Sequence, residues 1–364
     1  MAKIKAMVIP EPNQPLELWE FDEPKLDLNS MLLKTIYADV CGTDVHLYHG
    51  KLAGVPYPLI PGHISVGRID KLRGVVKDIE GNKFQEGDLV TFLDVHATCN
   101  NCWYCLVAKA STRCPHRKVY GITYGVKDGL SGGWAEKIYL KPGTKIFRIP
   151  NKVTPEQVIT AGCGLPTAIH AIELARIGLT DSVLIQGSGP VGLMATALAK
   201  LSGAGTIITI GAPMKRLEVA KKLGTTKSID ITKHDEKDRR QLVLELTNGR
   251  GADIGIECTG NPKAVPEGLN LIRDNGIYII VGQYTDHGNI EINPHLQINK
   301  KHLEIRGCWG SDFSHVYRGL QVLSHFNHHF NPELFRTKKY KLIDAQRALE
   351  DVEHLKVTKA ILKF

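Results

Sequence analysis

The pattern of hydrophobic and polar positions changes its character once along this chain. Before Thr154, short runs of β-branched and apolar residues are separated by Gly and Pro, which is typical of strands joined by turns. The strands expected from these runs are Lys3–Ile9, Met31–Ala38, Val66–Leu72, Asp88–Phe92 and Glu136–Leu140. The first part of the chain is therefore predicted to be a folded-over, β-barrel-like domain rather than a parallel sheet.

At Thr154 the pattern becomes helical. Thr154-Pro155-Glu156-Gln157 combines a capping hydroxyl, Pro at the first helical position and Gln three residues after the cap, so a long helix is predicted from here through Ile172 to Arg176. Strand and helix patterns then alternate. Strands are expected at Ser182–Gln186, Thr206–Ile210, Ser228–Ile231, Asp253–Glu257 and Ile277–Val281, and helices from Val191 and over Lys215–Leu223, Glu236–Thr247 and Lys263–Ile272. The strands are unbroken apolar runs, which favours a doubly wound parallel sheet covered on both faces.

Length and composition agree with a two-domain globular protein. A chain of 364 residues exceeds the size at which a single core usually stops growing, and 43% hydrophobic with 23% charged residues is an ordinary globular composition. No apolar run approaches the roughly 20 residues that span a bilayer. The charged N-terminus runs directly into a strand-like pattern rather than a signal peptide. We therefore expect a cytoplasmic protein that does not bind membranes.

The net charge is +8, from 46 basic and 38 acidic residues. These residues are dispersed, without a long basic block or basic residues interleaved with aromatic ones, so a basic surface is favoured over nucleic-acid binding and no nucleic-acid partner is expected. Such a surface would suit a phosphate-bearing cofactor.

A glycine motif indicates dinucleotide binding. Gly187-Ser188-Gly189-Pro190-Val191-Gly192 follows an expected buried strand and opens a helix. In this motif Gly187 permits the tight turn, Gly189 lets the backbone approach a pyrophosphate, and Gly192 allows close packing of helix and strand. The free N–H groups of the helix N-terminus would bind the phosphates.

The acid that usually follows this motif is missing. A carboxylate about 20 residues further on normally binds the ribose 2′-hydroxyl of NAD. Here the second strand ends at Gly211, which is followed by Ala212, Pro213, Met214, Lys215 and Arg216. Lys215 or Arg216 could reach the 2′-phosphate of NADP, although surface positions on the next helix are favoured for both. The cofactor is therefore expected to be NAD or NADP.

Four of the eight cysteines lie within sixteen residues, as Cys99, Cys102, Cys105 and Cys114. Eight cysteines are few for a disulfide scaffold of this length, and clustering in a reducing compartment indicates metal. Four thiolates suit tetrahedral zinc and leave no position open, so this zinc would be structural. An iron–sulfur cluster would need a different final spacing.

A third set of candidate ligands is dispersed. Cys41 and His46 belong to Cys41-Gly42-Thr43-Asp44-Val45-His46, His63 follows Gly62, and Cys163 lies between two glycines. Each of these residues alone could simply be packed in the core. Two Cys and one His on zinc would leave one position open, as in catalytic sites, but spacing alone does not bring them together.

Taken together, the motifs resemble the zinc-containing medium-chain alcohol dehydrogenase family over essentially the whole chain. They are Cys41–His46, Pro61-Gly62-His63, the four-cysteine loop, Gly132-Gly133-Trp134-Ala135-Glu136, Cys163, Gly187–Gly192 and Glu257-Cys258-Thr259-Gly260. The resemblance implies a GroES-like β-rich catalytic domain over residues 1–164, completed by 306–364, around an inserted Rossmann domain over 165–305.

The resemblance also implies an active site. Cys41, His63 and Cys163 would hold catalytic zinc, which acts as a Lewis acid on the substrate oxygen, giving two zinc ions per chain with the structural one. Thr43 would take the alcohol proton and pass it, through the ribose hydroxyl of the cofactor, to His46 at the surface, and Asp44 would orient the zinc-bound His63. Three further residues would bind the cofactor: Thr167 and Val191 beside the nicotinamide, and Lys359 at the pyrophosphate.

Two departures from the family pattern affect these expectations. Ile64 stands where the family usually has a Glu beside the zinc-binding His, so Cys163 becomes indispensable as the third ligand. Gly211 replaces the usual acid. Because polyol-oxidising relatives tend to carry Glu where this chain has Cys163, simple or aryl alcohols are favoured as substrates.

The expected partner is a small alcohol, aldehyde or ketone, and the expected assembly is a homotetramer or homodimer. Three alternatives remain open at this point: a polyol dehydrogenase, a metal-free quinone or enoyl reductase of the same superfamily, and a non-catalytic dinucleotide sensor or zinc-bearing nucleic-acid binder.

Overall fold

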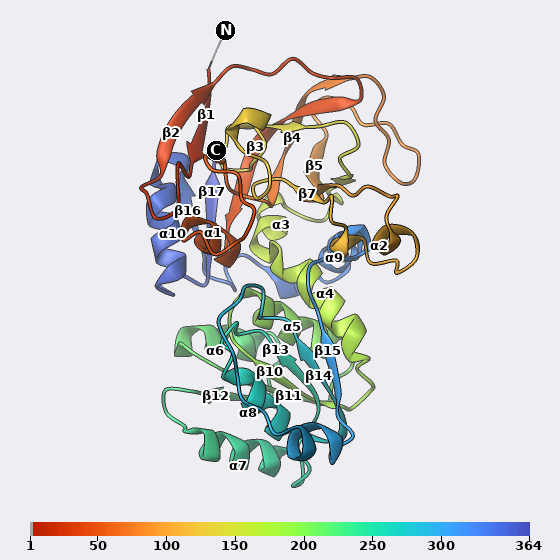
Figure 1. Cartoon of the computed structure of the whole chain (residues 1–364), viewed down its shortest axis with the longest axis vertical. Helices are drawn as coiled ribbons and strands as arrows, with labels where there is room; N and C mark the ends of the chain where they lie inside the picture. The colour runs from red at the N-terminus through yellow and green to blue at the C-terminus, as the bar shows by residue number, and fades with distance from the viewer. Residues whose placement is uncertain (1–2) are drawn as a thin grey trace. The chain divides into compact units, whose positions relative to one another are not determined.

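The computed structural model describes residues 3–364, which form two compact units (Figure 1). The first comprises the residues up to Gly162 together with Asp312–Phe364, and the second comprises Cys163–Ser311. The boundaries predicted from the sequence were 164 and 306.

The first unit is built on an antiparallel sheet in the order β16-β17-β3-β4-β5-β9, with β8 beside β3. Its strands are β1 (Ile4–Val8), β2 (Glu17–Phe21), β3 (Ser30–Val40), β4 (Ser65–Arg73), β5 (Leu89–Phe92), β6 (Val95–Ala97), β7 (Lys118–Val119), β8 (Lys137–Leu140), β9 (Ile146–Arg148), β16 (Thr337–Lys341) and β17 (Lys359–Lys363). The β1–β2 and β6–β7 pairs stand apart, and β16 and β17 are parallel to each other. The five strands predicted from the sequence are confirmed as β1, β3, β4, β5 and β8.

The helices of this unit are α1 (Gly42–Tyr48), α2 (Trp103–Leu106), α3 (Pro155–Ala161), α9 (Phe313–His325) and α10 (Ala345–Glu353). The pairing of β17 with β3, in the register Ala360 opposite Val40, places the last strand of the chain in the sheet that β3, β4, β5, β8 and β9 build.

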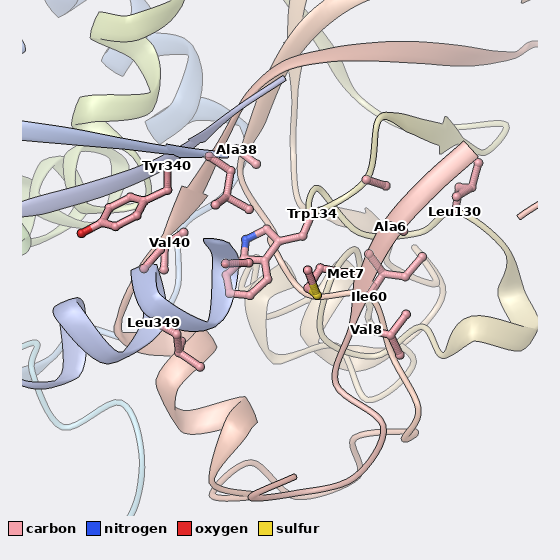
Figure 2. Close-up of a cluster of buried hydrophobic side chains, with 14 of the residues drawn as sticks. Ala6, Met7, Val8, Ala38, Val40, Ile60, Leu130, Trp134, Tyr340 and Leu349 are labelled. Carbon is pink, nitrogen blue, oxygen red and sulfur yellow. The ribbon is translucent and has the colours of Figure 1, made fainter. Parts of the chain in front are cut away.

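Trp134 lies in the core of the first unit. Its side chain is fully buried among residues of β1, β3 and α10, including Val40 and Leu349 (Figure 2). The backbone N–H of Met7 donates to the carbonyl oxygen of Trp134 at 2.8 Å, and Trp134 Nε1 donates to the carbonyl oxygen of Asp39 at 2.8 Å. The indole thereby connects β1, the Gly132–Trp134 turn and the end of β3.

The second unit has a parallel six-stranded sheet in the order β12-β11-β10-β13-β14-β15. Its strands are β10 (Ser182–Gln186), β11 (Thr206–Gly211), β12 (Lys227–Asp230), β13 (Ala252–Glu257), β14 (Ile272–Ile280) and β15 (Glu304–Gly307). This is the strand order of the Rossmann fold, which confirms the predicted doubly wound sheet. The sequence pattern missed β15, because only Ile305 in this edge strand is a large apolar residue.

The helices of the second unit are α4 (Gly164–Ala175), α5 (Pro190–Leu201), α6 (Met214–Lys222), α7 (Glu236–Leu246) and α8 (Ala264–Leu271). α5 contacts both α4 and α6, whereas α7 contacts α8, so the helices form two rows along the sheet (Figure 1).

Candidate functional site

Asp44 joins the two segments that carry Cys41 and His63. The carboxylate accepts a hydrogen bond from the backbone N–H of Cys41 at 2.9 Å through Oδ2, and one from the N–H of Gly62 at 3.1 Å through Oδ1. Asp44 is fully buried in the first turn of α1, and this burial raises the pKa of its carboxyl group, while the nearby His63 acts in the opposite direction. The bonds to Cys41 and Gly62 fix the start of α1 relative to the turn that presents His63.

Trp134 supports the same turn from the core. Gly62 has a φ of +88°, and a Cβ atom placed on it would overlap with Trp134 Cδ1. Only glycine combines this backbone conformation with so close an approach to the indole. The buried His63 is therefore presented by a turn that is packed directly on the core.

Cys163 lies at a break between two helices, and the single long helix predicted from Thr154 to Arg176 is wrong. The start of that prediction is confirmed: the N–H of Gln157 donates to Thr154 Oγ1 at 3.2 Å, and the N–H of Thr154 donates to Gln157 Oε1 at 2.9 Å. The helix ends, however, at Ala161, because Gly162 adopts a φ of +50°, and α4 begins only at Gly164. Cys163 therefore directly follows Gly162, the residue at which the N-terminal segment of the first unit ends.

The candidate ligand atoms of Cys41, His63 and Cys163 lie within 4.8 Å of one another. Two thiols and an imidazole at this separation fit zinc, and they leave one tetrahedral position open for a substrate oxygen. Within residues 3–364 no fourth His, Cys, Asp or Glu joins this group, and Ile64 has no donor atom to offer.

Cys99, Cys102, Cys105 and Cys114 form a second group, whose Sγ atoms also lie within 4.8 Å of one another. Cys114 Sγ lies 3.5 Å from Cys99 Sγ, close to the roughly 3.8 Å expected between two thiolates on one tetrahedral zinc. Burial raises the pKa of Cys114, but backbone N–H donors, that of Cys99 first, outweigh it and bring the pKa to about 7. Burial and the neighbouring Cys102 raise the pKa of Cys105 to about 11. A zinc ion would supply the positive charge that four adjacent thiolates require.

The residues assigned to the proton relay lie on α1. Thr43 and His46 are both half-buried and are three residues apart, a spacing that places side chains on the same side of a helix. Their roles remain predictions.

In the second unit, the three motif glycines have the environments that a pyrophosphate cradle needs. Gly187 has a φ of +108°, and a Cβ atom there would lie 2.9 Å from the carbonyl oxygen of Cys258. A Cβ atom on Gly192 would overlap with the carbonyl oxygen of Gly187, which is the close helix–strand packing expected. Gly189, the N-cap of α5, has open space at its Cβ position, so a ligand can approach its backbone.

Gly211 is buried against Ser188, the second residue of the glycine motif. A Cβ atom on Gly211 would lie 2.6 Å from Ser188 Oγ and 2.9 Å from Ser188 Cβ. The Ser188 hydroxyl is held there by a hydrogen bond to the carbonyl oxygen of Ala212, at 3.0 Å. The usual carboxylate is therefore not only missing from position 211 but also excluded by the neighbouring side chain.

The expectation that Lys215 and Arg216 both lie on the surface is confirmed for Lys215 and wrong for Arg216. Lys215 is exposed, but Arg216 is only 7% exposed, and this burial lowers the pKa of its guanidinium. Neighbouring residues of a helix project about 100° apart around its axis, so Arg216 lies on the buried side of α6 and Lys215 on the exposed side.

The structure reveals a role for Glu257 that sequence reasoning noted only as part of a motif. Its buried carboxylate accepts hydrogen bonds from the backbone N–H groups of Thr259 at 2.6 Å, Gly260 at 3.0 Å and Gly282 at 3.0 Å. These bonds join the loops that follow β13 and β14, at the sheet edge where Rossmann folds bind dinucleotides. In the sequence, the feature that could have indicated this role is a carboxyl group at the end of an apolar strand, at Glu257.

The remaining cofactor candidates are placed as follows. Thr167 on α4 and Val191 on α5 are half-buried. Lys359 is 3% exposed, and its Nζ lies 2.6 Å from Asp39 Oδ1. The predicted contact of Lys359 with a pyrophosphate remains a prediction.

Other residues singled out in the sequence have ordinary environments. Within residues 3–364, His325, His328 and His329 belong to no group that could hold a metal. Cys308 is buried, and this burial raises the pKa of its thiol to about 12. No single helix in the described part of the chain is long and apolar enough to cross a membrane, although α3 and α4 pass that test together as a bent pair, by length and composition alone.

Comparison with known proteins supports both the GroES-like first unit and the Rossmann-type second unit. Residues 27–151 match the family model of the alcohol dehydrogenase GroES-like domain, and residues 190–325 match that of zinc-binding dehydrogenases. The chain is 32% identical to 5-exo-hydroxycamphor dehydrogenase of Pseudomonas putida, over 97% of its own length and 96% of the relative. It is 28% identical to L-threonine 3-dehydrogenase of Vibrio parahaemolyticus, over 96% and 95% of the two chains. An alcohol dehydrogenase structure from Thermotoga maritima superposes with a TM-score of 0.94, at 32% identity and 100% coverage of both chains.

The GroES-like domain, the zinc-binding dehydrogenase domain and two groups of side chains that could hold a metal ion define a zinc-binding, dinucleotide-dependent dehydrogenase. The chain belongs to the zinc-containing alcohol dehydrogenase family of the medium-chain dehydrogenase/reductase superfamily. It is an NAD(P)-dependent oxidoreductase that acts on alcohols.

Proposed function

We propose that Cys41, His63 and Cys163 hold the catalytic zinc of this dehydrogenase and that a small alcohol binds at the open fourth position. The observation that carries the proposal is the convergence of these three side chains, from segments 22 and 100 residues apart, to within 4.8 Å of one another. When bound, zinc supplies Lewis-acid chemistry to the substrate oxygen, and the dinucleotide accepts or returns the hydride.

The chain's own side chains handle the proton. The Thr43 hydroxyl accepts the proton of the alcohol and gives up its own proton in return. His46, on the same side of α1, takes up a proton at one ring nitrogen and releases one to solvent, because an imidazole titrates near neutral pH. Asp44 is proposed to act indirectly: its two hydrogen bonds fix Cys41 and the Gly62–His63 turn, and thereby the positions of two proposed zinc ligands.

The four-cysteine group is proposed as a closed structural zinc site. With four thiol ligands, Cys99, Cys102, Cys105 and Cys114, no position remains for a substrate. This zinc would hold together the loop between β6 and β7, which contains the short helix α2 and a 3-10 turn at Ser111–Arg113, neither of which has a buried residue.

We also propose that the enzyme accepts NADP. Ser188 excludes a carboxylate at Gly211, so the charge that normally repels the 2′-phosphate is absent, and Arg216 places a cation near the N-terminus of the next helix. An opposing feature is Asp230, which lies beside Gly211 in the parallel register of β11 and β12. Its Oδ1 already accepts hydrogen bonds from the N–H and the hydroxyl of Thr232. If NAD is preferred, Asp230 is the residue that would bind the ribose 2′-hydroxyl in place of the missing acid at position 211.

The proposed substrates are apolar alcohols, including cyclic secondary ones, rather than polyols. The retained Cys163 favours this class, and the related hydroxycamphor dehydrogenase supports it. L-Threonine is included as a comparison substrate because of the second relative. A cytoplasmic location and a homodimer or homotetramer remain part of the proposal.

The test measures zinc content and turnover in the same preparations. The wild-type chain should hold two zinc ions, and Cys163→Ala should hold one, keep its fold by circular dichroism and lose dehydrogenase activity. Activity is followed by reduced-nicotinamide absorbance, with NAD and NADP each crossed with cyclic, aryl and aliphatic alcohols, a polyol and L-threonine. Full activity in Cys163→Ala would refute the ligand set. A reductase activity that resists zinc chelators would instead support the metal-free reductase.

A further inference from the structure

A buried ion pair joins the neighbouring strands β3 and β17 of the first unit's sheet. Asp39 is the penultimate residue of β3, Lys359 is the first residue of β17, and Nζ lies 2.6 Å from Oδ1. The side chains are 1% and 3% exposed. Removing two charges from water is costly, and replacing such a pair with apolar residues is often neutral or stabilising, so its contribution to stability does not explain its presence.

Asp39 touches the backbone next to each proposed ligand of the catalytic zinc. Two residues after it comes Cys41. Its backbone N–H donates to the carbonyl oxygen of Ile64 at 3.0 Å, and Ile64 directly follows His63. A Cβ atom on Gly162 would overlap with both Asp39 Oδ2 and Lys359 Nζ, so the ion pair packs directly on the residue that precedes Cys163.

The core holds Asp39 in this position. Trp134 Nε1 donates to its carbonyl oxygen at 2.8 Å, and the indole itself is fully buried (Figure 2). The backbone of Asp39 is thus held on both sides, and the ion pair with Lys359 holds its carboxylate beside Gly162. The left-handed φ of Gly162, +50°, is the conformation that turns the chain from α3 into Cys163.

We propose that the Asp39–Lys359 ion pair is a positioning device for the catalytic zinc site, which keeps Cys163 in place relative to Cys41 and His63. The inference rests on the proposed ligand set. Lys359 then acts as a positioning residue whose charge is already balanced by Asp39, instead of serving mainly as a base for the cofactor's pyrophosphate.

The deciding measurement is the rate at which zinc is transferred to a chromophoric chelator from the zinc-loaded, full-length enzyme. The four-cysteine site is an internal reference, because it lies on a different loop and should release its zinc at the same rate in every variant. Asp39→Asn and Lys359→Gln should each speed release of the catalytic zinc by about tenfold or more, the usual effect of losing a group that orients metal ligands.

Two further variants control for folding. The double variant D39N/K359Q leaves no uncompensated buried charge and keeps a hydrogen-bonding pair, so it decides the question if a single variant is insoluble; it should release zinc faster than wild type and more slowly than either single variant. Asp351→Asn weakens another ion pair of the same unit, Lys338 Nζ to Asp351 Oδ2 at 2.9 Å, whose lysine is 44% exposed, and should leave release of the catalytic zinc unchanged.

The outcomes separate the competing roles. If the wild type holds only the structural zinc, the proposed ligand set itself has failed. If it holds two zinc ions and D39N and the double variant release them at wild-type rates, the positioning role is refuted. If Lys359→Gln weakens dinucleotide binding about tenfold while zinc release is unchanged, the pyrophosphate role stands and the positioning role falls. The positioning role requires altered zinc release, with dinucleotide affinity within about threefold of wild type in fluorescence titrations.

Discussion

Ser188 fills the space in which the side chain of an acid at position 211 would begin. A Cβ atom on Gly211 would lie 2.6 Å from Ser188 Oγ, and this hydroxyl is anchored on the carbonyl oxygen of Ala212. The choice of cofactor is therefore linked to the second residue of the glycine motif, about twenty residues earlier in the chain.

This relationship predicts that Gly211→Asp alone will not create a good NAD enzyme. The new side chain collides with Ser188, so the variant should lose stability and bind both cofactors poorly. Adding Ser188→Gly removes the contacts with Oγ and Cβ and leaves the backbone nitrogen of residue 188, 2.9 Å from the new Cβ, to be relieved by a small shift of the chain. S188G/G211D should then shift the ratio of kcat/KM values toward NAD by about 10- to 100-fold relative to G211D, because a hydrogen bond to a charged group contributes roughly 1.5–3 kcal/mol. If G211D alone gave the full shift, the proposed steric exclusion would be wrong.

Arg216 is predicted to contribute to NADP binding. Arg216→Gln should raise the KM for NADP by about tenfold and change the KM for NAD by less than about twofold, because only NADP presents a phosphate for a charge-assisted hydrogen bond. The neighbouring Lys215→Gln is the matched control, since it removes the same charge from an exposed side chain of the same helix. Equal effects of the two substitutions would mean that general charge, rather than Arg216, attracts the cofactor.

Trp134 is predicted to stabilise the first unit and the turn before His63. Trp134→Ala should lower the free energy of unfolding by about 3–5 kcal/mol, the usual cost of truncating a fully buried Trp. Trp103, which is 63% exposed on α2, provides the comparison: Trp103→Ala should change stability by no more than about 0.5 kcal/mol. Urea denaturation of the zinc-loaded proteins measures both values. A small effect at Trp134 would contradict its place at the centre of the core.

His96 should make stability depend on pH in the weakly acidic range. Burial lowers its pKa below 6.5, and its neutral ring is held between the hydroxyl of Tyr124, at 2.5 Å, and the carbonyl oxygen of Pro142, at 3.0 Å. Since the unfolded chain protonates His96 more readily than the folded chain does, its contribution is complete above pH 6.5 and is lost as the pH falls below that value. In His96→Gln, the loss of melting temperature between pH 7 and pH 5 should be smaller than in the wild type. An unchanged slope would show that His96 is not the group responsible.

Much of the site was predictable because its signals are local in the sequence. The spacing of the four cysteines, the glycine motif after an apolar strand and the alternation of strands with helices all depend on residues a few positions apart. The break at Cys163 was not predictable in this way, since the apolar helical pattern continues through it and only the left-handed conformation of Gly162 ends α3. The edge strand β15 was not predicted for the opposite reason: with Ile305 as its one large apolar residue, its hydrophobic pattern is too weak to indicate a strand.

The sequence by itself determined the fold class, the clustering of the four cysteines, the glycine motif between a strand and a helix, and the absence of an acid at Gly211. Only the tertiary structure brought Cys41, His63 and Cys163 within 4.8 Å, placed Ser188 against Gly211 and paired Asp39 with Lys359. The physical reason is that side chains on distant segments meet through strand pairing and core packing. No spacing along the chain indicates that residues 39 and 359 will share one buried ion pair. The pairing of β3 with β17 sets Asp39 opposite Ile361, and Lys359 lies two residues along the same strand, on the same face of the sheet.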